Sequence, residues 1–383
     1  MPLIAASRAA QRSPACGRKN LQHQTETGRQ HICRPNMIWP DSRHLLCRQM
    51  GKTLDMNKRV QTVTGPIAAD DMGATLVHEH VLFAYPGYAG DVTFGPFDHA
   101  AVMDKCIAHC QQAQAHGVNT IVDATPNECG RDPLFLHELS ERAGVNIVCS
   151  TGYYYESQGA PHYFNFRQSL GFPVEDEIYE MMVREITVGI GKAGIRAGVI
   201  KLGSSKHTIT DYEQLFFRAG ARAQRETGVP IITHTTEGTM GPEQAELLIS
   251  LGVEPTKIQI GHMDGSTNPQ YHAQTMRHGV KIAFDSCGIQ RMLGMPMDDA
   301  RIELLLDLLK GGFGSQIMLS HDYVMHWLGR PLPVPPPIQQ LLPNWQMAGI
   351  FIYHLPALRA NAVSKGQIET LLVDNPRRLF AGE

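Results

Sequence analysis

The chain has 383 residues, of which 43 % are hydrophobic and 19 % are charged, and its formal net charge at pH 7 is −3. This composition is ordinary for a globular protein of one large or two medium domains. The slightly acidic balance argues against a nucleic-acid-binding protein, and no run of about eighteen apolar residues offers a membrane span. We therefore expect neither nucleic acid nor a membrane among its partners.

The eight cysteines are scattered along the chain and include no Cys-x-x-Cys pair. A chain of this length can bury a large core without covalent staples. The pattern therefore argues against a disulfide framework and favours a reducing compartment, so we expect a cytoplasmic protein.

The first 55 residues differ from the rest of the chain. They hold nine basic and three acidic residues, and neither a helical nor a strand period runs through them. We expect a disordered basic leader over residues 1–55, preceding a functional start at Met56. The alternative, an organelle transit peptide, lacks the amphipathic period that such peptides show. A single domain is expected over residues 56–383.

From Val60 onward, short apolar runs alternate with longer amphipathic segments. The runs are predicted strands, at residues 75–80, 119–123, 146–151, 197–202, 230–234, 257–261, 281–284 and 316–320. Helices are predicted near residues 98–116, 131–143, 176–193, 211–227, 241–252, 269–278 and 298–313, with a closing helical region over 345–380. Eight such units indicate an α/β fold, a (β/α)8 TIM barrel. A doubly wound open sheet is the alternative, but no G-x-G-x-x-G follows the first strand.

The first predicted strand carries two imidazoles, His78 and His80. Successive strand side chains point to opposite faces, so these two point the same way and could hold a divalent metal. The alternative is a chance pair of core or surface histidines. In a (β/α)8 barrel the chemistry lies at the carboxyl ends of the strands, so other metal-binding side chains should follow the other runs.

Metal-binding side chains do follow or lie within other apolar runs, at Lys201, His234, His262 and Asp322. A lysine inside an apolar strand is desolvated, which lowers its pKa, and the neutral amine can take up CO2 as an anionic carbamate that bridges two cations. The alternative for Lys201 is a lysine that reaches water at a strand edge. Asp322 can ligate a metal and can also accept a proton.

An apolar wall is predicted beside Asp322. The proline-rich loop over residues 329–337 is stiff and extended. With Phe83, Met325 and Trp327 it could line a space for an acyl or alkyl group. The alternative is a surface loop without substrate contact.

The motifs together resemble the phosphotriesterase family of the amidohydrolase superfamily, which includes organophosphate triesterases and phosphotriesterase-like lactonases. The motifs are His-Glu-His (78–80), Val-Ile-Lys-Leu-Gly (199–203), Thr-His-Thr (233–235), Ile-Gly-His-Met-Asp (260–264) and Ser-His-Asp (320–322). Further likeness lies at Gly-Arg-Asp (130–132), Thr-Gly-Tyr-Tyr (151–154) and Asp-Asn-Pro-Arg-Arg-Leu-Phe (374–380). The resemblance covers roughly residues 60–381.

This resemblance implies a binuclear metal centre at the carboxyl face of the strands. The more buried metal would be held by His78, His80 and Asp322. The more exposed one would be held by His234 and His262. Carboxylated Lys201, with its CO2-derived carbamate, would bridge both metals together with a hydroxide. Zinc is the first expectation for the metals, with Co, Mn, Fe and Ni as alternatives, since N/O ligands accept all of them.

The implied activity is hydrolysis of a small-molecule lactone, carboxylic ester or phosphotriester by the bridging hydroxide, with Asp322 taking the released proton. Tyr154 stands where the lactonase branch carries tyrosine and the triesterase branch tryptophan, which favours lactones; the alternative is a packing aromatic. A dedicated phosphotriesterase, a mononuclear deaminase and a metal-loaded binding protein are the competing hypotheses. The resemblance to the family also implies that the protein forms a homodimer.

Overall fold

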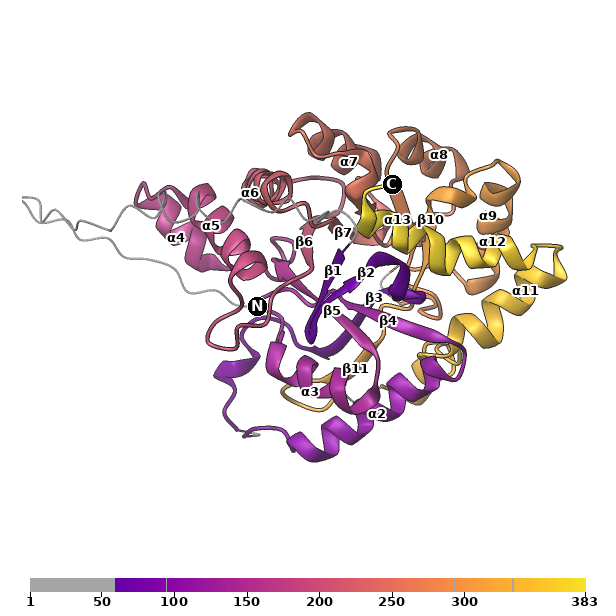
Figure 1. Cartoon of the computed structure of the whole chain (residues 1–383), viewed down its shortest axis with the longest axis horizontal. Coiled ribbons are helices and arrows are strands. Elements are labelled where there is room, and N and C mark those ends of the chain that lie inside the picture. The colour runs from indigo at the N-terminus through magenta and orange to yellow at the C-terminus, as the bar shows by residue number, and fades with distance from the viewer. Residues whose placement is uncertain (1–58, 94, 293, 333) are drawn as a thin grey trace, which may run out of the picture. The chain divides into compact units, whose positions relative to one another are not determined.

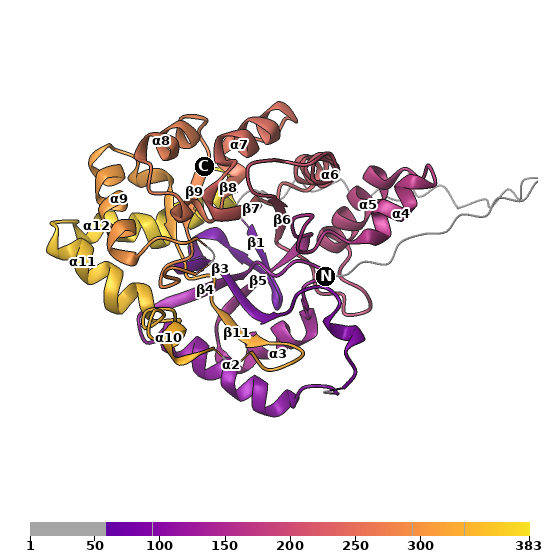
Figure 2. The same cartoon turned by 180° about the vertical axis from the view of Figure 1, so that it is seen from behind.

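The computed structural model describes residues 59–383, except residues 94, 293 and 333. The predicted leader over residues 1–55 and the predicted start at Met56 lie outside the described residues, so both stay predictions. Figures 1 and 2 show the described elements in colour from two opposite sides, with helices arranged around the strands.

Nine parallel strands in the described residues form one sheet, in which β3 to β10 pair in chain order and the last strand, β11, pairs with β3. They are β3 (Ala74–Phe83), β4 (Val118–Asp123), β5 (Asn146–Gly152), β6 (Val199–Ser204), β7 (Ile231–Thr235), β8 (Ile258–Ile260), β9 (Lys281–Phe284), β10 (Ile317–Leu319) and β11 (Val324–Trp327). Each of the eight predicted runs coincides with one of β3 to β10. The (β/α)8 barrel is confirmed, and the open doubly wound sheet is wrong.

The eighth strand closes the barrel in two pieces. β10 pairs with β9, and after a break at residues 320–323 the chain continues as β11, which pairs in parallel with β3. Two backbone hydrogen bonds bridge the break, from Asp322 N to the His78 carbonyl (3.1 Å) and from His80 N to the Tyr323 carbonyl (2.9 Å). The apolar pattern predicted β10 but not β11, because polar residues interrupt the run between them.

Most predicted helices are present, with ends shifted by a few residues. They are α2 (His99–Gln114), α3 (Pro133–Ala143), α5 (Val174–Thr187), α6 (Asp211–Thr227), α7 (Gly241–Ser250), α8 (Pro269–Arg277), α9 (Asp298–Lys310), α11 (Leu355–Ala360), α12 (Lys365–Glu369) and α13 (Asn375–Ala381). Two short helices, α4 (His162–Ser169) and α10 (Pro336–Gln339), were not predicted.

Side-chain caps explain several helix boundaries. Asp132 accepts hydrogen bonds from two backbone N–H groups at the start of α3, and Gly144 ends that helix in the left-handed conformation. Thr210 and Glu213 form a capping box at the start of α6. Such caps satisfy the free N–H groups of a first turn and fix where the preceding loop ends.

Two hydrophobic layers hold the barrel together. The outer layer lies between strands and helices and includes Leu76, Ile200 and Ile231. The inner layer fills the barrel and includes Val77, Val199, Ile232, Ala283 and Met318.

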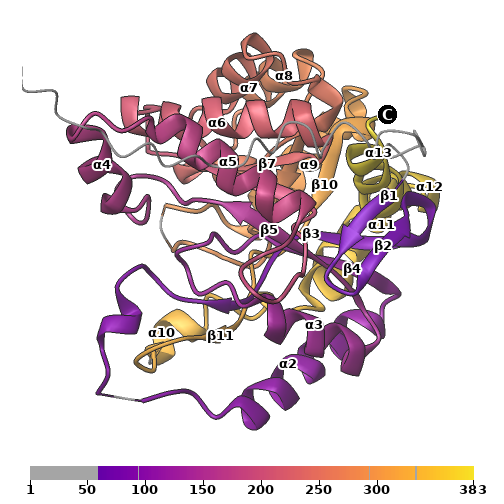
Figure 3. The same cartoon turned by 60° about the vertical axis from the view of Figure 1, so that its left-hand side comes forward.

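The hairpin of β1 (Arg59–Thr62) and β2 (Gly65–Ala68) was also not predicted. It lies beside α13 in Figure 3, and both contribute side chains to the inner layer at the end of the barrel away from the strand-end histidines.

None of the helices within the described part of the chain combines the length and the hydropathy that crossing a bilayer demands. The cytoplasmic location stays a prediction.

Candidate metal centre

His78 and His80 lie near the middle of β3 and face into the barrel. The register against β4 shifts between Leu76 and Glu79, and a shift of this kind re-aims side chains near active sites. Both imidazoles meet the same carboxylate: Asp322 Oδ1 lies 3.0 Å from His80 Nε2 and 3.6 Å from His78 Nε2. The predicted common direction of the two histidines is confirmed.

Lys201 is placed by strand alternation. Val199 belongs to the inner layer, so Lys201, two residues later, also points inward, where it is 1 % exposed. Its Nζ lies 3.0 Å from His78 Nε2. The alternative of a lysine that reaches water at a strand edge is therefore wrong.

His234 and His262 come from the ends of β7 and β8. Their ring centroids are 4.5 Å apart, and His262 lies 4.6 Å from the His78 ring. His262 and Asp322 both turn into the site through a left-handed backbone, with φ of 53° at each. Non-glycine residues adopt this conformation at a cost and mostly where function requires it.

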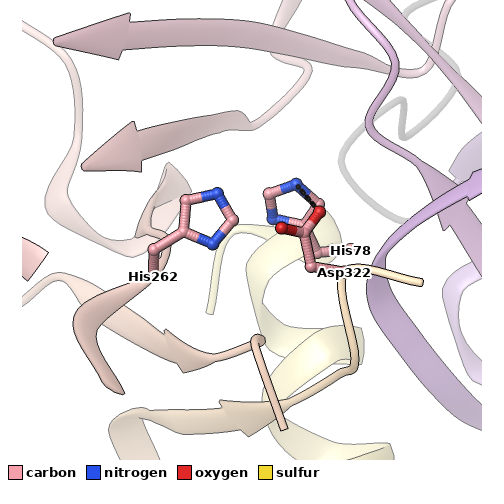
Figure 4. A group of neighbouring side chains, drawn as sticks. All are labelled: His78, His262 and Asp322. Atoms are coloured by element: carbon pink, nitrogen blue, oxygen red, sulfur yellow. Dashed lines mark ion pairs between the residues drawn. The ribbon is translucent and has the colours of Figure 1, made fainter. Parts of the chain in front are cut away.

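Nitrogen and oxygen ligand atoms of His78, His262 and Asp322 all lie within 4.8 Å of one another (Figure 4). The resemblance to the family implied that His78 and Asp322 hold one metal and His262 the other. The structure brings the two predicted half-sites into one continuous cluster.

Outer hydrogen bonds engage the Nδ1 atoms of three histidines, so that their Nε2 atoms face the other residues of the centre. His78 Nδ1 donates to Asp285 (2.7 Å), His262 Nδ1 donates to the same carboxylate (2.9 Å), and His80 Nδ1 donates to the Thr125 hydroxyl (2.8 Å). A partner on one ring nitrogen fixes the tautomer and presents the lone pair of the other nitrogen, the usual arrangement of metal-binding histidines.

The fourth histidine carries an unpaired buried atom. His234 Nδ1 is buried and has no hydrogen-bond partner among the described residues, while its Nε2 lies 3.2 Å from the Thr236 hydroxyl. Buried polar atoms are nearly always paired. The unpaired nitrogen therefore fits a ring that is completed by a bound cation.

Burial and charge set the protonation of these groups. Burial, helped by Lys201, lowers the pKa of His78 to about 3, and burial lowers the pKa of His234 well below its ordinary value. Burial also lowers the pKa of Lys201 to about 8. Burial alone would raise the pKa of Asp322, but the neighbouring imidazoles, His262 foremost, hold it well below its ordinary value. Neutral His78 and His234, a neutral Lys201 amine and an ionised Asp322 carboxylate are the forms that a cation requires.

Asp285 is the main residue that the sequence analysis missed. It is fully buried after β9, and it accepts hydrogen bonds from His78 Nδ1, His262 Nδ1 and the His262 backbone N–H (2.6 Å). One carboxylate thus joins histidines from β3 and β8. The signal was present, because Asp285 directly follows the predicted strand over residues 281–284.

Aromatic side chains line the mouth of the site. The Tyr154 ring lies 5.0 Å from the His234 ring, and the neighbouring Tyr155, which sequence reasoning had not singled out, stacks on His234 at 4.7 Å. The ring centroids of Phe83 and Trp327 are 5.4 Å apart. This part of the predicted apolar wall is present, but Met325 packs in the outer layer and does not belong to it.

Two charged residues hold the loops beneath Tyr154. Arg131 forms a bidentate ion pair with Glu185 (2.7 and 3.0 Å) and donates to the Ser150 carbonyl. Glu128 accepts a hydrogen bond from the Tyr154 backbone N–H (2.7 Å), and its second oxygen is buried without a partner in the described part of the chain. These contacts fix the position of Tyr154 in the loop after β5.

The donor set and its surroundings fit divalent cations. Four imidazoles, one carboxylate and one desolvated amine converge at the carboxyl ends of five strands, and an outer ring of Asp285 and Thr125 orients the ligands. Such outer partners are typical of metal sites.

Comparisons with known proteins agree with this site. The model of the phosphotriesterase family matches residues 58–380. The solved organophosphorus hydrolase from Deinococcus radiodurans is 56 % identical, with a TM-score of 0.83, and the match covers 84 % of this chain and 97 % of that one.

Curated relatives are more distant. An aryldialkylphosphatase of Saccharolobus solfataricus is 33 % identical over 318 residues, covering 82 % of this chain and 97 % of the relative. A phospho-furanose lactonase of Mycoplasmopsis synoviae is 30 % identical over 340 residues, and the match covers 85 % of this chain and 92 % of the relative. On this evidence, the chain belongs to the phosphotriesterase family.

Proposed function

We propose that this protein is a binuclear metal-dependent hydrolase that cleaves lactones and carboxylic esters and also accepts organophosphate triesters as secondary substrates. The observation that carries the proposal is the buried Lys201, 3.0 Å from His78 Nε2 and surrounded by the strand-end histidines. A cationic lysine in that position would repel a metal, whereas its carbamate would bind two. A mononuclear deaminase has no need of such a lysine.

The chain's own groups have distinct parts in this reaction. Because the pKa of Lys201 is about 8, a usable fraction of the amine is neutral at physiological pH and can take up CO2. His78, His80 and Asp322 would hold one cation, His234 and His262 the other, and the Lys201 carbamate would join them. Zinc is the first candidate, with Co, Mn, Fe or Ni as alternatives. When bound, the two cations would supply hydroxide at neutral pH and polarise the substrate's C=O or P=O oxygen.

Asp322 is suited to receive the proton released during hydrolysis. Its carboxylate is held ionised by the surrounding imidazoles, yet its side chain is 25 % exposed, so a proton taken up there can pass to water. Phe83 and Trp327 would receive the acyl or alkyl part of the substrate and exclude water from that side. The Tyr154 phenol, next to His234, would hydrogen-bond the lactone oxygen.

A dedicated phosphotriesterase is the second candidate. Two of the relatives named above carry phosphatase or organophosphorus hydrolase names. Tyr154 and the lactonase among the relatives support the first candidate. We also propose a homodimer, which light scattering would test.

The deciding experiment measures metal content and hydrolysis on one purified sample, prepared with metal and bicarbonate. Its substrates are γ- and δ-lactones, aryl esters and paraoxon-like triesters. Two metals per chain and preferred turnover of lactones would support the proposal. Preferred turnover of triesters would support the second candidate. One metal or none would refute the binuclear centre, and two metals without any turnover would favour a binding role.

A further inference from the structure

Glu79 separates the two histidines of the His-Glu-His motif, and its carboxylate is fully buried. Its partners all come from the break between β10 and β11. Oε1 accepts hydrogen bonds from Ser320 Oγ (2.8 Å), His321 N (3.0 Å) and His321 Nδ1 (2.8 Å), and Oε2 accepts one from Tyr323 N (2.7 Å). One side chain therefore binds the residues immediately before and after Asp322.

The backbone of Asp322 requires such support. Its φ of 53° lies in the left-handed region, which is unfavourable for a non-glycine residue. In this conformation the side chain turns inward and Oδ1 comes within 3.0 Å of His80 Nε2. The four hydrogen bonds that the Glu79 side chain accepts offset this cost, because they hold the chain on both sides of Asp322.

His321 completes the support from outside the barrel. Its Nδ1–H donates to Glu79, and its Nε2 accepts a hydrogen bond from the Ile350 backbone N–H (3.0 Å). The His321 carbonyl also accepts one from Trp345 Nε1 (3.1 Å). The ring is thus fixed at both nitrogens, and the segment around residues 345–350 is tied to the strand that carries Asp322.

We propose that Glu79 and His321 form a positioning pair, which holds Asp322 in the backbone conformation that turns its carboxylate toward His78 and His80. This role rests on the proposed function for its catalytic consequence, but its effect on the ligand set can be measured separately. The pair acts through Asp322 and touches neither substrate nor cation.

Glu79→Gln tests the pair with almost no change in volume. The amide retains one acceptor oxygen, but its NH2 must face N–H donors on one side, so the hold on Asp322 weakens. The matched control is Glu213→Gln. Glu213 is also buried, 1 % exposed, and it accepts hydrogen bonds from Ser205 Oγ and from two backbone N–H groups, Glu156 and Thr210.

Both variants are expected to lower the free energy of unfolding in urea. Only Glu79→Gln should weaken the binding of one Co2+ per chain, by about 10- to 100-fold in chelator competition, and alter the visible spectrum of the Co2+-loaded protein. Its kcat for the best ester should fall about 10-fold or more, with KM changed by less than about threefold, because binding surfaces are intact.

The proposal would be overturned if Glu79→Gln bound Co2+ with the affinity and the spectrum of the wild type. It would also be overturned if Glu213→Gln lost as much Co2+ affinity as Glu79→Gln. If Glu79→Gln does not fold, His321→Ala replaces it, since that variant keeps Glu79 but removes the ring that donates to Glu79 and accepts from Ile350. A weakened Co2+ site then supports the pair, and an unchanged site overturns it. If the wild type binds metal but hydrolyses none of the esters, the proposed function fails, while the Co2+ readout still decides the positioning role.

Discussion

Replacing Asp285 with asparagine should weaken metal binding although Asp285 is not among the expected ligands. The carboxylate accepts three hydrogen bonds, from His78 Nδ1 and from two N–H groups of His262. If the asparagine oxygen keeps the His262 contacts, its NH2 group faces the N–H of His78. His78 must then rotate or move its proton to Nε2, the atom that faces the centre.

The size of the effect follows from these contacts. A hydrogen bond to a charged group contributes about 1.5–3 kcal/mol. Loss of one such bond, converted at about 1.4 kcal/mol per tenfold change, gives a 10- to 100-fold weaker metal site. This range agrees with the usual effect of removing an outer partner of a metal-binding histidine.

The measurement is Zn2+ or Co2+ affinity by competition with a chromophoric chelator. Asp307→Asn is the matched control, because Asp307 lies on α9 with its side chain 63 % exposed and touches none of the site residues. Asp285→Asn protein that unfolds cooperatively and binds metal within twofold of the wild type would refute the reasoning.

Four further variants test other parts of the argument. Lys201→Ala should lose one metal and about 100-fold or more in kcat while still folding, since the bridging ligand is gone; two retained metals with full activity would contradict this. Tyr154→Phe should lower kcat/KM for lactones by about 2- to 10-fold, the value of one neutral hydrogen bond, and leave kcat/KM for triesters almost unchanged. Equal losses of kcat/KM for both substrate classes would show that Tyr154 does not set the preference for lactones. Burial raises the pKa of Glu128 to about 7, so the folded wild type resists ionisation there and loses stability as the pH rises from about 4.5 to about 7. The stability advantage of Glu128→Gln in urea unfolding should therefore grow across that window by up to about 1 kcal/mol per pH unit, and a constant difference would count against the assignment. Arg131→Met should cost about 3–5 kcal/mol in urea unfolding, because the Glu185 side chain, only 13 % exposed, loses its bidentate ion pair; a loss below about 1 kcal/mol would show that water reaches that pair.

The site could be located from the sequence because of one physical regularity. Parallel strands of a barrel end at the same face, so polar residues at the ends of separate apolar runs are brought together. This rule located all six residues that converge in the structure, from His78 at the first strand to Asp322 at the eighth. It also placed Lys201 correctly inside the barrel.

The same rule also reaches Asp285, which directly follows the predicted strand over residues 281–284, but it does not reveal which residues the orienting side chains contact. Asp285 bonds to a histidine 207 residues away, and Glu79 bonds to residues more than 240 positions along the chain. Local alternation gives the face on which a side chain lies, but not its partner across the barrel. Glu79 also points away from the two histidines beside it, so its role is visible only once the eighth strand is in place.

The sequence by itself determined the fold class, the order of the strands and the identity of the six converging side chains, because these depend on local periodicity and on the direction in which parallel strands run. Only the tertiary structure decided how the strands close into a barrel. The polar break at residues 320–323 separates β10 from β11, and the left-handed turn at Asp322 is held there by contacts that come from β3 and from the segment near Ile350. Contacts of such long sequence separation form only when the barrel is complete, so no local pattern in the chain predicts them.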